Sequence, residues 1–119
     1  MRNNKRAVFS WILIAALSSS YSFAKDNEFY GEIWDSVCAK TGSHDAMMKK
    51  AGVNTTEKCT IGCAMMRGKY VLYDPAAKRI YNLDDQKTPL EFAAKKVRVA
   101  GTLDKATSTI HVTHIELAH

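Results

Sequence analysis

The chain has 119 residues, enough for one small domain, and its 17 Lys and Arg exceed its 12 Asp and Glu to give a net charge of +5. The charges are interspersed, and no basic stripe with interleaved aromatic residues occurs, so nucleic acid is not an expected partner. The sequence also lacks the signatures of a serine hydrolase, a phosphate-binding loop and covalently attached haem, and we expect a protein that is not an enzyme.

Residues 1–24 have the three-part pattern of an export signal peptide. Three cations precede an apolar run from Ala7 to Leu17, and Ser22-Phe23-Ala24 supplies small residues where a signal peptidase reads them. The apolar run is shorter than the roughly 20 residues that span a bilayer. The pattern predicts cleavage after Ala24, a periplasmic or secreted protein without a membrane span after cleavage, and a single domain over residues 25–119.

The mature chain begins with an alternating segment and then becomes helical. Alternation over Phe29–Asp35 predicts a first strand with a bend or bulge at Gly31. From Ser36 to Gly68 the apolar residues recur at helical spacing. Two helices are expected there, over residues 44–51 after a cap at Ser43 and over residues 57–66 after a cap at Thr55 or Thr56.

After Gly68 the sequence returns to strands. Asp74-Pro75-Ala76-Ala77 is typical of a type I turn, and a second turn is expected over residues 104–108. In the last strand the apolar phase slips by one residue, which predicts a β-bulge near Thr113-His114. The expected strands are residues 69–74, 79–84, 95–104 and 108–117, with a short helical turn over residues 90–95.

This element order is that of an OB-fold, in which five strands form a small Greek-key barrel. We therefore predict a mainly β fold, a small five-stranded OB-like barrel with a short two-helix, cysteine-containing insertion between strands 1 and 2. A flat meander sheet with both helices packed on one face is the alternative. Closure is favoured because five short strands in an open sheet leave exposed edges.

Four segments carry a resemblance to known proteins. They are GEIWDSVCA from Gly31, His44 with the methionines after it, CTIGCAMMRGKYVLYDP from Cys59, and FAAKKVRVAGTLDKATSTIHV from Phe92. Together they resemble a family of small exported bacterial proteins of uncharacterised function. The last segment is also similar to the final two strands of periplasmic OB-fold proteins, where A-G-K-x-V-x-V-x-G-x-L recurs and Ala94 here replaces the first glycine. The resemblance implies an OB-like fold and an exported location, and it implies no activity.

Three cysteines, Cys38, Cys59 and Cys63, lie in the helical region. An odd count in an exported chain leaves at least one thiol without a partner in the same chain, or bound to a metal. On a helix, Cys59 and Cys63 would have Cβ atoms roughly 6 Å apart, which is poor for a disulfide between them. One interpretation is a structural disulfide from Cys38 to Cys59 or Cys63, which would add roughly 3 kcal/mol of stability.

The other interpretation is a metal site. Cys38, His44, Cys59 and Cys63 form a Cys3His set that fits tetrahedral zinc. The methionines at positions 47, 48, 65 and 66 would add soft ligands that suit Cu(I). Methionines in such helices more often fill the core, and a histidine at a helix N-terminus more often lies at the surface. Thiol redox chemistry is disfavoured because the spacing is one residue longer than Cys-x-x-Cys.

We expect an exported, monomeric, small binding protein whose insertion binds a zinc or copper ion or is stapled by a disulfide. The alternative is an envelope interaction module that holds a protein or glycan partner through the barrel surface and binds no metal. In a regular strand His111 and His114 fall on opposite faces, so they are not expected to share an ion unless the bulge re-aims one of them.

Overall fold

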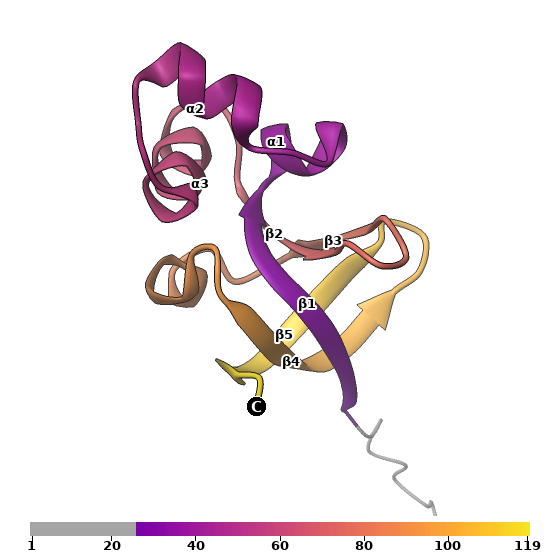
Figure 1. Ribbon diagram of the computed structural model, residues 1–119. Helices are drawn as coiled ribbons and strands as arrows, with labels where there is room; N and C mark the ends of the chain where they lie inside the picture. The colour runs from indigo at the N-terminus through magenta and orange to yellow at the C-terminus, as the bar shows by residue number, and fades with distance from the viewer. Residues whose placement is uncertain (1–25) are drawn as a thin grey trace, which may run out of the picture.

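The computed structural model describes residues 26–119 (Figure 1). The predicted signal peptide and its cleavage after Ala24 lie outside the described residues. The described chain is mainly β, and its elements follow in the order β1 (Asn27–Asp35), α1 (Ser36–Thr41), α2 (Asp45–Ala51), α3 (Thr56–Met66), β2 (Tyr70–Asp74), β3 (Arg79–Leu83), the 3-10 turn η1 (Thr88–Phe92), β4 (Lys96–Asp104) and β5 (Thr109–Leu117).

The five strands close into a ring in the order β1-β2-β3-β5-β4. Neighbouring strands are antiparallel except β3 and β5, which run parallel and pair only through Asn82 with Thr109 and Leu83 with Ile110. β1 joins the two sides of the ring, because its first part pairs with β4 and its last part with β2. The alternative of a flat meander sheet is wrong, and the expectation of five strands in a closed sheet is confirmed.

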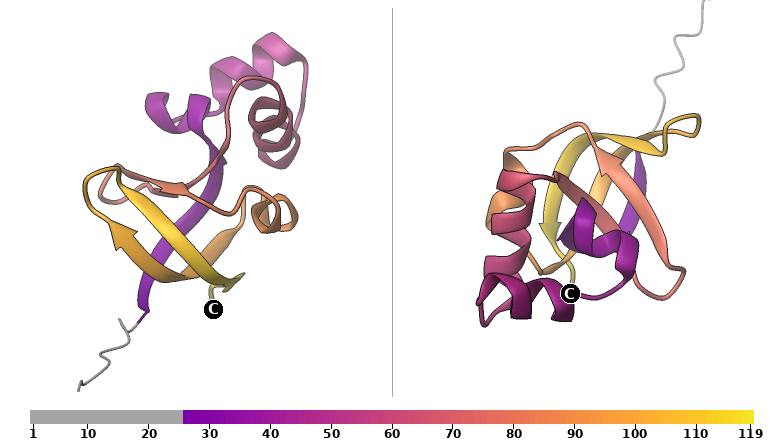
Figure 2. Two further views of the ribbon diagram at one scale, coloured as in Figure 1. Left: turned by 180° about the vertical axis from the view of Figure 1, so that it is seen from behind. Right: turned by 90° about the horizontal axis from the view of Figure 1, so that it is seen from above.

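The helices α1, α2 and α3 lie together over one end of the closed sheet, between β1 and β2 in the chain (Figures 1 and 2). The sequence predicted two of them. It missed α1, which begins directly after β1, where the Asp35 carboxylate accepts a hydrogen bond from the backbone N–H of Cys38 at 2.8 Å. The helix ends after only six residues at Gly42, whose φ of 74° suits glycine. A helix this short gives no readable periodicity.

Alternation along β1 and β2 divides the buried residues into two clusters. Ile33 and Leu72 point into the ring and pack with Val97, Val99 and Ile110 of β4 and β5. The opposite face carries a second cluster that packs against the helices, consisting of Trp34, Cys38, Ala39, Cys59, Val71 and Tyr73. The helical insertion therefore has a small core of its own, and two of the three cysteines belong to it.

The β-bulge that the sequence predicted in the last strand is confirmed. Ala100 pairs with His114 while Gly101 pairs with Val112, which leaves Thr113 as the extra residue of the predicted bulge. Gly31 lies where β1 passes from β4 to β2, and a Cβ there would come within 2.5 Å of the Tyr73 carbonyl oxygen. Glycine therefore permits a close approach of two backbones at this point. Within residues 26–119, no helix is both long and apolar enough to cross a membrane.

Candidate metal centre

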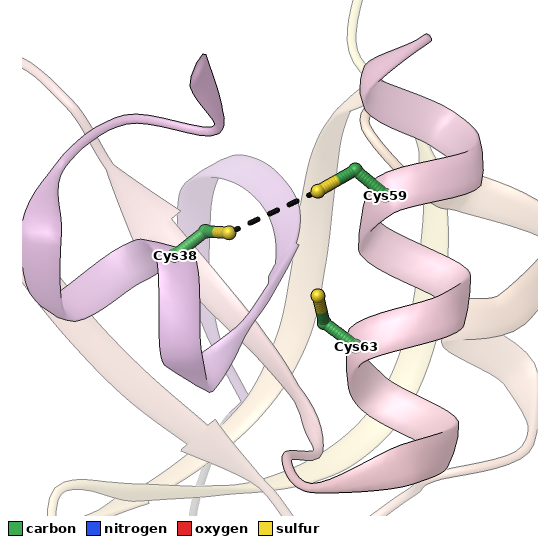
Figure 3. A group of neighbouring side chains, drawn as sticks. All are labelled: Cys38, Cys59 and Cys63. Atoms are coloured by element: carbon green, nitrogen blue, oxygen red, sulfur yellow. Dashed lines mark hydrogen bonds between the residues drawn. The ribbon is translucent and has the colours of Figure 1, made fainter. Parts of the chain in front are cut away.

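Three cysteine side chains meet between α1 and α3 (Figure 3). Cys38 comes from α1, and Cys59 and Cys63 come from successive turns of α3, with their sulfur atoms directed toward a common space. The Sγ atoms of Cys38 and Cys59 are 4.0 Å apart, and all three Sγ atoms lie within 4.8 Å of one another. The structure thus brings together the three cysteines that the sequence singled out.

The helix ends fix the positions of these thiols. Thr55 caps α3 by accepting a hydrogen bond from the backbone N–H of Lys58 at 3.2 Å, one residue before Cys59. At the other end, the carbonyl of Cys63 accepts hydrogen bonds from the backbone N–H groups of Arg67 and Gly68. Cys38 is placed by the Asp35 cap of α1. Each cysteine is therefore held within one turn of a capped helix end.

All three cysteines are free thiols in the described chain. The 4.0 Å between Cys38 and Cys59 is about twice the length of an S–S bond. Both of these residues are 2% exposed, whereas Cys63 is half-buried. The predicted disulfide from Cys38 to Cys59 or Cys63 stays a prediction.

The surroundings of Cys38 and Cys63 disfavour reactive thiolates. Burial, followed by the nearby Asp35 carboxylate and the neighbouring Cys59 side chain, raises the pKa of Cys63 to about 11. Burial, the Asp35 carboxylate and Cys59 likewise raise the pKa of Cys38 far above its usual value. A cysteine that attacks disulfides needs a lowered pKa, so this arrangement is opposite to that of a thiol oxidoreductase.

His44 lies in the interior, and the expectation that it is a surface residue is wrong. It is 5% exposed, and its ring packs on Trp34 with the ring centroids 4.0 Å apart. Its Nδ1 atom is 3.8 Å from Oδ1 of Asp35, a fully buried residue, and this separation is too long for a hydrogen bond. The turn that begins at Gly42 folds the start of α2 back over Trp34, which sequence spacing does not reveal.

Asp35, Cys38 and His44 form a second group of possible ligands, whose ligand atoms lie within 4.8 Å of one another. Cys38 belongs to both groups, while His44 does not share a group with Cys59 and Cys63. The predicted Cys3His set is therefore assembled only in part. Sequence analysis missed Asp35, although an aspartate directly before Ser-Val-Cys-Ala is a typical helix cap. Burial lowers the pKa of His44, against the charges of Asp35 and Glu32, and so favours its neutral, metal-binding form.

A cavity of about 490 Å³ adjoins the thiols on the side of α2 and α3. Its lining includes Cys59, Cys63, Met47 and Met66. Met47 and Met48 pack against the cluster around Cys38, as expected of core methionines. For Met65 and Met66 that expectation is wrong, because they are 75% and 82% exposed on the last turn of α3. The cavity therefore borders two of the three cysteines, Cys59 and Cys63.

The remaining histidines of β5 lie apart from this centre. His111 contacts Asp84, with its Nδ1 atom 3.2 Å from Oδ2, and His114 contacts Glu116. Both rings are more than half exposed. Because Thr113 is the extra residue of the bulge, His111 pairs with Thr102 and His114 with Ala100, so both histidines lie on the exposed face of β5 and the prediction of opposite faces is wrong. No protein-family profile, curated protein or solved structure matches the chain.

Proposed function

We propose that this protein is an exported metal-binding protein in which the thiolates of Cys38, Cys59 and Cys63 hold a zinc or copper(I) ion. The convergence of three sulfur atoms within 4.8 Å carries this proposal. Sulfur ligands about 2.3 Å from zinc lie about 3.8 Å apart in a tetrahedral site and about 4.0 Å apart in a trigonal one. The Cys38–Cys59 separation of 4.0 Å fits either geometry.

Access and ligand chemistry also support the proposal. Cys63 is the least buried of the three thiols and borders the 490 Å³ cavity, so an ion has a path to the sulfur atoms. Met47 and Met66 line the same cavity, and thioether sulfur is a ligand that soft ions such as Cu(I) accept. Metal binding also accounts for an odd number of cysteines in one cluster, since three thiols cannot all be paired within one chain.

The scaffold in this proposal is an OB-like barrel placed outside the cytoplasm. The ring order β1-β2-β3-β5-β4, with η1 between β3 and β4, supports the OB-like assignment. The signal pattern of residues 1–24 supports export. In this view the closed sheet holds the ends of β1 and β2 together, and the helical insertion between them carries the ligands.

Mass spectrometry tests the proposal directly. The exported chain is purified in reductant, exposed to Zn²⁺ or to Cu(I), and freed of unbound ion before its native and denatured masses are measured. We expect at least one ion on the native protein and none on the denatured protein. Retention of no ion by the reduced chain, together with a mass about 2 Da lower for the chain purified without reductant, would instead show a structural disulfide.

A further inference from the structure

We infer that the centre is dinuclear, with a second Zn²⁺ ion held by Asp35, Cys38 and His44 and with the Cys38 thiolate bridging the two ions. This inference rests on the proposed function, because it needs the first ion on Cys38, Cys59 and Cys63. The two groups of possible ligands have Cys38 as their common member. One sulfur atom thus lies within reach of both sets of partners.

Unpartnered polar atoms point to the second ion. Oδ1 of Asp35 and both ring nitrogens of His44 are buried and have no hydrogen-bond partner among the described residues. Buried polar groups in folded proteins are normally paired, because their desolvation is otherwise uncompensated. A cation between Oδ1 and one ring nitrogen would give two of these three atoms a partner at once.

The side chains that would hold this ion are already fixed in place. Oδ2 of Asp35 accepts the hydrogen bond from the Cys38 backbone N–H, which leaves Oδ1 directed toward Nδ1 of His44 at 3.8 Å. Oxygen and nitrogen ligands at about 2.0–2.2 Å from zinc lie about 3.4 Å apart in a tetrahedral site. A closure of a few tenths of an ångström would bring Oδ1 and Nδ1 to that separation, and the stacking of Trp34 on His44 orients the ring.

Charge and ligand type identify the ion as Zn²⁺. When the three thiols release their protons to solvent, their negative charges and that of Asp35 are balanced by two divalent cations, and a buried neutral cluster is far less costly than a charged one. Zinc binds sulfur, imidazole nitrogen and carboxylate oxygen alike. Cu(I) favours soft sulfur ligands, and a carboxylate suits it poorly.

The test is the number of zinc ions per chain, measured by native mass spectrometry on the reduced, exported protein titrated with Zn²⁺. We expect two ions on the wild type and one on His44→Ala. Asp35→Asn should also hold one, since asparagine still caps α1 but carries no charge. His111→Ala is the matched control, because it removes an exposed histidine that also lies beside an aspartate, and it should retain two ions.

The outcomes separate the second ion from the first. One zinc ion on the wild type would overturn the dinuclear centre, whether or not His44→Ala weakens its binding. If that single ion is lost from Cys59→Ser, the proposed function would stand without the second ion. No zinc on the wild type, under conditions where circular dichroism shows a folded chain, would overturn the proposed function itself. Two ions on wild type, His44→Ala and Asp35→Asn alike would place the second ion elsewhere and also overturn this inference.

Discussion

Replacement of Cys59 by Ser is expected to lower the affinity of the chain for zinc by about 100-fold. A four-ligand structural zinc site contributes about 10–16 kcal/mol, or about 3 kcal/mol for each ligand, which corresponds to about 100-fold in affinity. Serine is close to cysteine in size, so the packing of α3 against α1 should survive the change. Competition with a chromogenic zinc chelator, performed in reductant, measures the loss.

Two further variants make this prediction specific to the thiols. Cys63→Ser should weaken zinc binding to a similar extent, because all three sulfur atoms share one group. Met65→Leu should leave the affinity unchanged, since this side chain is 75% exposed and does not line the cavity beside the thiols. Under the disulfide interpretation, with Cys38 bonded to Cys59, Cys63→Ser would leave the stability of the fold unchanged. Affinities that are equal in the wild type and in all three variants would show that zinc binds elsewhere.

Replacement of Gly101 by Ala is expected to destabilise the fold by about 3 kcal/mol. A Cβ at position 101 would lie 2.2 Å from the carbonyl oxygen of His111, across the bulge where β4 pairs with β5. The obstacle is backbone rather than a flexible side chain, so the two strands must separate to relieve it. Urea denaturation followed by circular dichroism gives the change in the free energy of unfolding.

Gly62→Ala is the matched control for this change. Gly62 lies within α3, and an added Cβ there would meet nothing within 4 Å. Alanine should therefore stabilise the helix by roughly 0.5–1 kcal/mol. If Gly101→Ala unfolded at the same urea concentration as the wild type, the close approach of β4 and β5 at the bulge would be wrong.

The strands were predictable because each carries its own local signal. Alternation placed Val97 and Val99 on the buried face, and a one-residue slip in that alternation located the bulge at Thr113. The parallel contact between β3 and β5 was not predictable in register, because it consists of only two residue pairs between distant segments. Closure of the sheet depends on this contact. The contact itself depends on the three-dimensional path of the chain and leaves no local pattern in the sequence.

The candidate site was predictable to a smaller extent. The four-residue spacing of Cys59 and Cys63 predicted that they share one helix face. The position of Cys38 directly after the first strand predicted that it could reach either of these two cysteines. The interior position of His44 depends on a turn at Gly42 and on stacking against Trp34, and neither leaves a periodic pattern. Asp35 was not recognised as a candidate ligand because its capping role already explains an aspartate at that position.

The sulfur content of the first coordination shell tests the central claim most directly. X-ray absorption at the zinc edge, on the reduced chain loaded with Zn²⁺ and freed of excess ion, reports the ligand atoms and their distances. Thiolate binding by Cys38, Cys59 and Cys63 predicts a dominant sulfur shell at about 2.3 Å, with lighter atoms at about 2.0–2.2 Å contributing less. A shell made only of oxygen and nitrogen would contradict the account, because the ion would then lie away from the three cysteines.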